Sequence, residues 1–291
     1  MNLFAFGLGY TALAFIRGHR NRFAAVAGTV RAAGKAEALA REGLRVRLLP
    51  GEEAAVAGDL AGAEAVLVSV PPDGSGDPVL ARFAEALAAA PRLAWIGYLS
   101  TIGVYGDQGG AWVDEATPPA PRSPRSRQRL AAEEAWLAFG ARTRRPVHVF
   151  RLAGIYGPGR NALKNLAEGR AKRLVKPGQV FNRIHVDDIA AALLASLDRP
   201  RAGAVYNLAD DEPAPPQDVV AHAARLLGVA PPPEQPFDPD TLTPMAASFY
   251  GENKRAANAL IKRELALSWR YPTYREGLAA LFRAGEGGQA A

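Results

Sequence analysis

Leu3-Phe4-Ala5-Phe6 leads directly into Gly7-Leu8-Gly9-Tyr10-Thr11-Ala12, and Leu13-Ala14-Phe15-Ile16 follows. The first four residues are typical of a strand, and the last four of the start of a helix. A dinucleotide pyrophosphate needs this order. The first glycine makes a tight turn, the second lets the backbone approach the phosphates, and a small third residue, here Ala12, lets helix and strand pack closely. The helix would also direct unpaired N–H groups and its positive dipole end at the phosphates.

This turn predicts a cofactor site in which Gly7, Gly9, Tyr10 and Thr11 contact the ligand. An ordinary glycine turn is the alternative, because such a pattern alone is a weak signal. The strand-turn-helix context favours the cofactor.

Composition predicts a globular protein with one large domain and a smaller lobe, since 48% of the 291 residues are hydrophobic. The absence of cysteine excludes disulfides and thiolate metal sites. The four histidines are scattered, so we expect no dedicated transition-metal site. We find no signal-peptide pattern, and apolar runs such as Ile189 to Leu197 are too short to span a bilayer. These features predict a soluble cytoplasmic protein.

Positive charge is concentrated in one part of the chain. The net charge is +6, and the stretch from Gly157 to Arg183 holds seven basic residues and one acid, Glu168. Because few aromatic residues lie among them, this stretch favours an anionic small molecule as partner, with no nucleic acid and no membrane. A solvated helix face rich in Arg and Lys is the alternative.

Apolar strand-like runs alternate with Ala- and Leu-rich helical segments along the chain. After the first run they comprise Phe23 to Val26, Arg45 to Leu49, Ala65 to Val70, Leu93 to Ser100, Val147 to Leu152 and Ala204 to Leu208. This alternation predicts an α/β fold, a Rossmann-type doubly wound parallel sheet whose ligands bind beyond the carboxyl ends of the strands. The glycine turn, Pro71-Pro72, Ser100-Thr101 and Gly154 to Pro158 should then gather around one crevice, with Pro71 beside the cofactor.

The residue pattern of the chain changes after Leu208. After Leu208, two proline-rich stretches, Pro213 to Pro216 and Pro231 to Pro236, separate shorter helical pieces. We expect residues 1–156 and 184–209 to form the dinucleotide-binding domain, and residues 157–183 and 210–291 a smaller C-terminal substrate-binding lobe. The alternative is that the proline-rich stretches are rigid packing segments.

The end of the second predicted strand bears on the choice of cofactor. An NAD site places an acid there to bind the ribose hydroxyls. The chain has Ala27-Gly28-Thr29-Val30-Arg31 instead, in which Thr29 offers a hydroxyl and Arg31 a forked cation suited to a 2′-phosphate. We therefore predict NADP as cofactor, with NAD less favoured. The alternative is that Arg31 simply ends the strand in solvent.

Four ordered motifs carry a family resemblance between residue 3 and about residue 210. After the glycine turn come Ser100-Thr101-Ile102-Gly103-Val104-Tyr105-Gly106-Asp107, Arg151-Leu152-Ala153-Gly154-Ile155-Tyr156-Gly157-Pro158-Gly159, Arg183-Ile184-His185-Val186-Asp187-Asp188-Ile189-Ala190 and Val205-Tyr206-Asn207-Leu208. Together they resemble the extended short-chain dehydrogenase/reductase superfamily, in its NAD(P)-dependent epimerase/dehydratase branch. The resemblance implies a nicotinamide cofactor and often a nucleotide-sugar substrate. It also implies a homodimer.

The same resemblance points to catalytic positions that this chain fills unusually. It implies that Thr101 orients the substrate oxygen. A Tyr and a Lys four residues apart should follow, but counting back from Glu133 places Arg125 and Arg129 there. Arg129 can still supply positive charge and bind the cofactor ribose. Arg125 cannot exchange a proton near neutral pH.

Replacement residues must come from the same crevice. Tyr105 and Tyr156 follow strands and are candidates for acid–base work or substrate contact, as are the loop acids Asp107, Asp114 and Glu115, although packing and capping are the alternatives for all five. The family's diphosphate-binding Arg position is Phe181 here. Arg183 lies two residues later, on the same strand face, and is a candidate for a displaced phosphate ligand. Asn161 and Lys164 are weaker substrate candidates.

Two functions follow from these residues. The first is an NAD(P)-dependent oxidoreductase or epimerase/dehydratase-like enzyme, with Thr101, Tyr105 and Arg129 as its catalytic candidates. The second is a non-catalytic NADP-binding sensor, suggested by the missing Tyr and Lys. A hydrolase or transferase has no supporting motif.

Overall fold

The computed structural model describes residues 1–288, without the side chains of residues 244–246. Its main element is a seven-stranded sheet in the order β11-β7-β5-β4-β1-β2-β3. These strands span Asn2–Phe6 (β1), Ala25–Val30 (β2), Arg45–Leu48 (β3), Ala65–Val68 (β4), Trp95–Thr101 (β5), Val147–Leu152 (β7) and Ala204–Leu208 (β11). β1 pairs in parallel with β2 and β4, and the β2–β3 and β4–β5 pairs are also parallel. The sequence prediction of a doubly wound parallel sheet is therefore confirmed.

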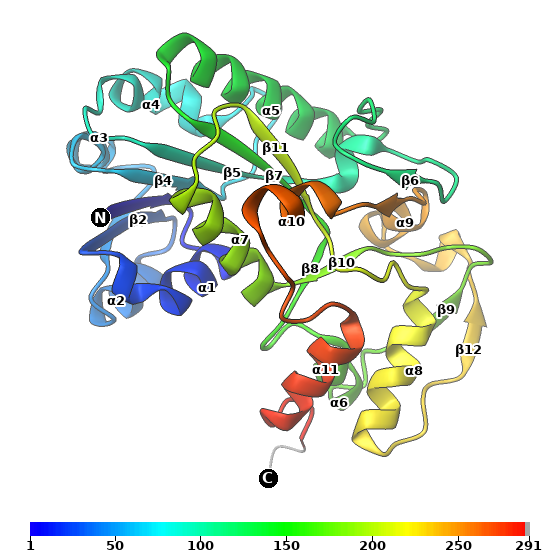
Figure 1. Cartoon of the computed structure of the whole chain (residues 1–291). Helices are drawn as coiled ribbons and strands as arrows, with labels where there is room; N and C mark the ends of the chain where they lie inside the picture. Colours follow the sequence, from blue (N-terminus) through cyan, green and yellow to red (C-terminus); the bar gives the residue numbers. More distant parts are fainter. Residues whose placement is uncertain (289–291) are drawn as a thin grey trace. The chain divides into compact units, whose positions relative to one another are not determined.

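Helices connect these strands and cover both faces of the sheet. They span Tyr10–Gly18 (α1), Ala33–Arg41 (α2), Glu53–Ala61 (α3), Pro78–Ala89 (α4), Pro124–Thr143 (α5) and Val186–Asp198 (α7), with a short 3-10 helix at Arg20–Arg22 (η1). α1 and α2 lie on one face, and α3, α4 and α5 lie on the other (Figure 1). This arrangement follows from right-handed crossovers that leave β1 in opposite directions along the sheet.

The core against α4 and α5 is built from alternate residues of neighbouring strands. Phe4 and Phe6 of β1 share a buried cluster with side chains of β4, β5, α4 and α5. Its strand members include Val66, Val68, Ile96, Tyr98, Val147 and Val149, and its α5 members Ala132, Trp136 and Phe139. The spacing of two along each strand places all of them on one face. The other face of these strands is buried too, which explains why the sequence reads as continuous apolar runs.

The second strand differs from its predicted span of Phe23 to Val26. β2 begins at Ala25 and continues through Gly28 and Thr29 to Val30. Phe23 instead packs beside Phe15 of α1, with ring centroids 5.5 Å apart. Pairing with β1 and β3 on both sides overrides the weak strand preference of glycine. Gly28 is also required for packing, since a Cβ there would lie 2.6 Å from the Ala5 carbonyl oxygen.

The chain divides into two compact units. Unit 1 comprises Met1–Thr101, Pro124–Arg151 and Ile189–Tyr206, and unit 2 comprises Ile102–Ser123, Leu152–Asp188 and Asn207–Ala291, of which residues 289–291 lie outside the described part. This division assigns residues 102–123, 152–156, 184–188 and 207–209 to unit 2, whereas the sequence placed them in the dinucleotide-binding domain. The first two segments begin at the carboxyl ends of β5 and β7, so a sequence pattern gives no sign of the change of unit.

Unit 2 is built from short elements around its own core. Its strands pair in parallel as β8 with β10, β9 with β12 and β6 with β13. The strands span Trp112–Val113 (β6), Gly154–Tyr156 (β8), Arg173–Val175 (β9), Arg183–His185 (β10), Glu234–Pro236 (β12) and Arg255–Ala256 (β13). The helices span Ile102–Tyr105 (η2), Ala162–Ala167 (α6), Pro216–Leu227 (α8), Pro239–Thr241 (η3), Pro244–Tyr250 (α9), Ala259–Leu265 (α10) and Tyr274–Arg283 (α11).

The core of unit 2 joins α6, α8 and α11. Tyr156, Leu163, Val219 and Leu278 belong to its buried cluster. Capping residues define the start of α11 and the end of α8. Thr273 and Glu276 form a capping box at the start of α11, and Gly228 takes the left-handed conformation at the end of α8. Within residues 1–288, no helix is long and apolar enough to cross a membrane.

Candidate functional site

Thr29 holds the glycine turn from the neighbouring strand. Its hydroxyl oxygen accepts a hydrogen bond from the Gly7 N–H at 2.9 Å, and its carbonyl oxygen accepts one from the Leu8 N–H at 2.9 Å. Gly7 has a φ of +85°, a conformation that favours glycine. Ser69, just after β4, donates to the Gly7 carbonyl oxygen at 2.6 Å. The buried Thr29 hydroxyl therefore shapes the turn. Its contact with the cofactor remains a prediction.

The second glycine of the turn has no packing reason within the protein. A Cβ built at Gly9 would meet no atom within 4 Å, and its φ of −90° suits any residue. A Cβ at Gly7 would approach the Ser69 and Val70 side chains at 3.0 Å. Gly18, Gly34 and Gly58 share this open surrounding, so the case for a ligand depends on the place of Gly9 in the turn, where the second glycine lets the backbone approach a pyrophosphate.

The start of α1 fits the same ligand. Gly9 is the N-cap of this helix and provides no side-chain cap, and no acidic residue lies in the first turn. The first N–H groups of a helix need partners from outside the helix, and an anion suits them. The residues present therefore fit a dinucleotide pyrophosphate at Gly9, Tyr10 and Thr11.

The remaining predicted cofactor residues follow adjacent strands of the sheet. Arg31 comes directly after β2 and is exposed, and no acid occupies β2. Pro71 is exposed in the loop after β4. Because β2, β1 and β4 are neighbours, Arg31, the glycine turn and Pro71 follow the carboxyl ends of three adjacent strands.

The two arginines at the expected Tyr and Lys positions lie on α5 and differ in burial. Arg125 is exposed, whereas Arg129 is half-buried. The Arg129 Nη1 donates to the Tyr98 hydroxyl at 3.1 Å and to the Leu99 carbonyl oxygen at 2.9 Å. Burial raises the pKa of Tyr98, although the Arg129 charge acts in the opposite direction. Arg129 thus binds β5, and Tyr98 remains a neutral phenol.

Thr101 ends β5 and is half-buried. The carboxyl end of a parallel strand is where such folds place ligand contacts, so this position agrees with a role in orienting substrate. Its role remains a prediction.

Within unit 2, Tyr105 is completely buried in η2. Its hydroxyl donates to Asn207 Oδ1 at 2.8 Å, and the Asn207 N–H donates to Glu115 Oε1 at 2.7 Å. This geometry favours the packing alternative for Tyr105 and Glu115. Their proposed part in catalysis remains a prediction without a supporting contact.

The other loop acids fix local structure. Asp107 accepts hydrogen bonds from the N–H groups of Asn253 and Gly109, and these bonds, with the Arg122 charge, lower its pKa. Asp114 caps a turn by accepting from the N–H and hydroxyl groups of Thr117. Both carboxylates therefore have structural partners.

Two of the three predicted substrate residues serve the core of unit 2. The Tyr156 hydroxyl donates to the Thr273 carbonyl oxygen at 3.3 Å, and burial raises the pKa of this tyrosine. Asn161 is the N-cap of α6, where its side chain accepts from the Lys164 N–H at 3.0 Å. Their roles in binding substrate remain predictions.

Arg183 is the third predicted substrate residue and is held differently. Its Nη1 donates to the Phe181 carbonyl oxygen at 2.9 Å and to the Ala214 carbonyl oxygen at 3.1 Å. Burial lowers the pKa of Arg183, and the nearby Asp210 charge opposes that change. Two backbone carbonyl oxygens thus hold Nη1 of the guanidinium. The binding of an anionic substrate by Arg183 remains a prediction.

Asp210 was not identified from the sequence. It lies two residues after the end of β11 and is 2% exposed, and one carboxyl oxygen, Oδ2, has no hydrogen-bond partner among the described residues. Burial raises the pKa of Asp210 to about 8. A carboxyl in this state marks a functional candidate. The signal available in the sequence was an acid two residues after a strand.

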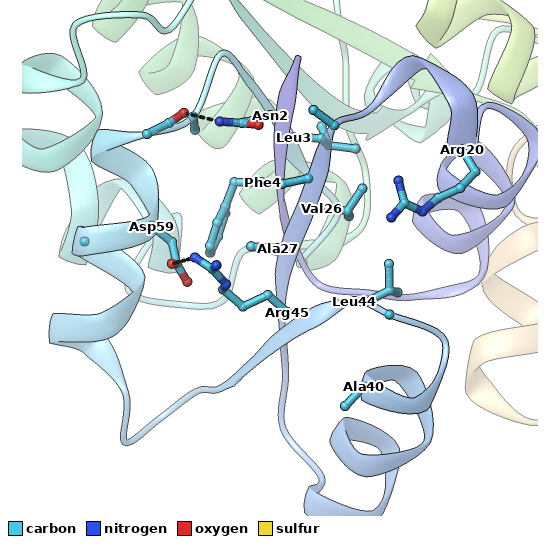
Figure 2. A pocket seen from close by; sticks show the side chains of 16 residues that line it. Asn2, Leu3, Phe4, Arg20, Val26, Ala27, Ala40, Leu44, Arg45 and Asp59 are labelled. Carbon is cyan, nitrogen blue, oxygen red and sulfur yellow. Dashed lines mark hydrogen bonds and ion pairs between the residues drawn. The ribbon is translucent and has the colours of Figure 1, made fainter.

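One hollow lies away from these residues. It has a volume of about 480 Å³ and lies at the amino ends of β1 and β2, opposite the glycine turn. Figure 2 shows Arg45 beside Asp59 here, and these side chains form an ion pair at 3.1 Å. The hollow occurs where β3 begins later than β2, and ligands of this fold bind at the other end of the strands. Among the described residues, no group of three or more metal-ligating side chains occurs.

Part of the chain is similar to a known family and to a curated protein. Residues 81–209 match the family described as the NAD dependent epimerase/dehydratase family. Protein YeeZ of Escherichia coli (strain K12) is 33% identical over 177 residues, which cover 58% of this chain and 61% of YeeZ. The match thus spans less than two thirds of that curated relative.

Solved structures match over nearly the whole chain. A functionally unknown conserved protein from Silicibacter pomeroyi DSS is 50% identical, with a TM-score of 0.90 and coverage of 98% of this chain and 99% of that one. A dTDP-glucose 4,6-dehydratase from Bacillus anthracis str. Ames, solved in complex with NAD, is 19% identical, with a TM-score of 0.75 and coverage of 98% and 97%. The second likeness shows the fold alone.

The sheet order and the glycine turn define a Rossmann-type protein with a dinucleotide-binding motif. Over residues 81–209 the chain is similar to the NAD dependent epimerase/dehydratase family.

Proposed function

We propose that this chain binds NADP at the glycine turn and acts as an NAD(P)-dependent oxidoreductase or epimerase/dehydratase-like enzyme on a small substrate. The observation that carries the proposal is Gly9, at which a Cβ would meet no protein atom within 4 Å, beside a helix without a side-chain cap. The similarity of residues 81–209 to the NAD dependent epimerase/dehydratase family supports the same cofactor class. We further propose a cytoplasmic location and a homodimer, by analogy with the family.

The preference for NADP rests on Arg31. An exposed guanidinium follows β2, where an acid would contact the ribose hydroxyls of NAD, and a 2′-phosphate would pair with this cation. The dehydratase from Bacillus anthracis was solved with NAD. The proposed preference for NADP therefore rests on this chain's own residues and not on that likeness.

Fluorescence titration with NADPH and NADH tests this preference. We expect tighter binding of NADPH, and Arg31→Ala should weaken NADPH binding about tenfold or more while leaving NADH nearly unchanged. Arg41→Ala, an exposed arginine at the end of α2, is the matched control. Tighter binding of NADH by the unaltered protein would overturn the assignment.

The chemistry divides between the cofactor and the chain. A bound nicotinamide supplies or accepts hydride. Thr101 would orient the substrate oxygen, and Arg129 would contribute positive charge from α5. Arg125 cannot donate or accept a proton near neutral pH, because a guanidinium does not deprotonate in proteins. The proton must therefore come from another group or from water.

The proposed substrate is a nucleotide sugar or another phosphorylated small molecule. Arg183 supports this class, because two backbone carbonyls orient its guanidinium inside unit 2. At least three of the six other basic residues between Gly157 and Arg183 are paired with acids, since Arg170 and Lys164 contact Glu168, and Arg173 contacts Glu234. Recognition of an anion would thus depend on Arg183 more than on the net charge of that stretch.

A second candidate function is a non-catalytic NADP-binding sensor. The observation that favours it is the hydrogen bonding of Arg129 to β5 in place of a Tyr/Lys dyad. Incubation with NADPH or NADP and a panel of nucleotide sugars, aldehydes and ketones separates the two. Turnover that Thr101→Val abolishes, with cofactor affinity retained, supports the enzyme. Tight binding without any oxidation or reduction supports the sensor.

A further inference from the structure

We infer that Glu133 is a positioning residue that fixes the carboxyl end of β5, and with it Thr101, through Ser100 and Arg151. This inference rests on the proposed role of Thr101, and it assigns a buried ion pair to the support of the same site.

The geometry at Glu133 is that of a fully paired buried carboxylate. Glu133 is 1% exposed and Arg151 is 6% exposed. Arg151 donates to Glu133 Oε2 from Nε at 3.1 Å and from Nη2 at 2.8 Å. The Ser100 hydroxyl donates to Glu133 Oε1. A bidentate guanidinium and a hydroxyl thus set the orientation of this carboxylate.

The network joins three elements of unit 1. Glu133 lies on α5, Ser100 is the next-to-last residue of β5, and Arg151 is the next-to-last residue of β7. β5 and β7 are neighbours in the sheet. The carboxylate therefore ties α5 to the carboxyl ends of both strands, one residue before Thr101.

Arg129 extends the same restraint by one helical turn. Its guanidinium holds the Tyr98 hydroxyl and the Leu99 carbonyl oxygen, and Glu133 holds the Ser100 hydroxyl. Three consecutive residues before Thr101 are thus hydrogen-bonded to α5 side chains. Arg129 and Glu133 are four residues apart, so they project from the same face of the helix.

Stability alone does not explain the ion pair. A buried ion pair often gives no more stability than apolar side chains of the same volume, because both charges lose their hydration. Its directional bonds instead fix one arrangement of strand and helix. Small misplacements of reacting groups are costly in catalysis, which gives such fixation a purpose.

The cysteine-free sequence allows a direct test without turnover. Thr101→Cys introduces a single thiol, whose alkylation by iodoacetamide is followed from pH 7 to pH 10 without cofactor. The profile is compared in backgrounds carrying Glu133→Gln, Ser100→Ala or Glu134→Gln. Glu134 is exposed on the same helix and gives the matched control.

We expect Glu133→Gln to raise the alkylation rate at pH 7 about threefold or more, because the unbalanced Arg129 and Arg151 charges favour the thiolate and the strand end loosens. Ser100→Ala should raise the rate in the same direction, and Glu134→Gln should leave it unchanged. A folded Glu133→Gln variant with a lower Tm but an unchanged profile would overturn the inference. If that variant does not fold, an unchanged profile in Ser100→Ala would do so. The test uses no cofactor, so it stands apart from a failure of NADPH binding.

Discussion

The glycine turn and the first half of α5 both belong to unit 1, but their polar groups differ in how far the protein itself satisfies them. At the turn, Thr29 satisfies the N–H groups of Gly7 and Leu8, and the start of α1 has no side-chain cap. On α5, the side chains of Arg129 and Glu133 bind β5 and Arg151. The turn is therefore arranged to receive a ligand, whereas α5 has become part of the framework. This contrast explains how a complete cofactor motif can coexist with an altered catalytic dyad.

We expect the largest effect on stability from Gly28, and almost none from Gly9. Gly28→Val should lower the free energy of unfolding by about 2 kcal/mol or more, since its Cβ would lie 2.6 Å from the Ala5 carbonyl oxygen. Gly9→Val should change it by less than about 0.5 kcal/mol. Urea unfolding of both variants measures the difference, and equal losses would mean that protein packing explains Gly9 as well.

Thr29→Val tests the support of the turn. It removes the acceptor of the Gly7 N–H inside the protein, which should cost about 1–3 kcal/mol and weaken NADPH binding. Thr29→Ser keeps the hydroxyl and is the control. The same loss in both variants would contradict the assignment, because Ser retains the acceptor that Val lacks.

Arg129→Met tests the framework side of the contrast. Loss of the bonds to the Tyr98 hydroxyl and the Leu99 carbonyl oxygen should lower stability by about 1–2 kcal/mol, measured by urea unfolding. Unchanged stability with abolished NADPH binding would reverse the contrast and make Arg129 chiefly a ligand-binding residue.

Asp210 gives a second comparison, within unit 2. Its side chain is buried, and its Oδ2 has no hydrogen-bond partner among the described residues. Burial raises its pKa to about 8 in the folded protein, against about 4 in the unfolded chain, so the folded state holds the proton more tightly. Stability should therefore fall as pH rises through this range, by about 1 kcal/mol between pH 7 and pH 9. Asp210→Asn should flatten that part of the profile, and an unchanged slope would contradict the shift.

The sequence predicted the elements whose signal is local. Alternation of apolar runs and helices gave the parallel sheet, and the turn from Gly7 to Ala12 lies between β1 and α1 as expected. The end of β2 was harder, because its pairing with β1 and β3 decides its length. The same pairing turns the Thr29 hydroxyl toward Gly7, 22 residues away in sequence.

The site was less predictable wherever its partners are distant in sequence. Glu133 served in the sequence only as a marker for counting back to Arg129 and Arg125. Its pairing with Arg151 and Ser100 depends on how α5 packs on two strands. The state of Asp210 likewise depends on burial by segments far along the chain. Spacing alone carries neither kind of information.

The central claim is that the turn around Gly9 is a dinucleotide site, and NADPH titration of the unaltered protein beside Gly9→Val tests it most directly. The account predicts saturable one-to-one binding by the unaltered protein and its loss by about a hundredfold or more in a Gly9→Val variant of unchanged Tm, because the new side chain would occupy the approach of the pyrophosphate. Equal NADPH affinity in both proteins, or no saturable binding of NADPH or NADH by the folded unaltered protein, would contradict it.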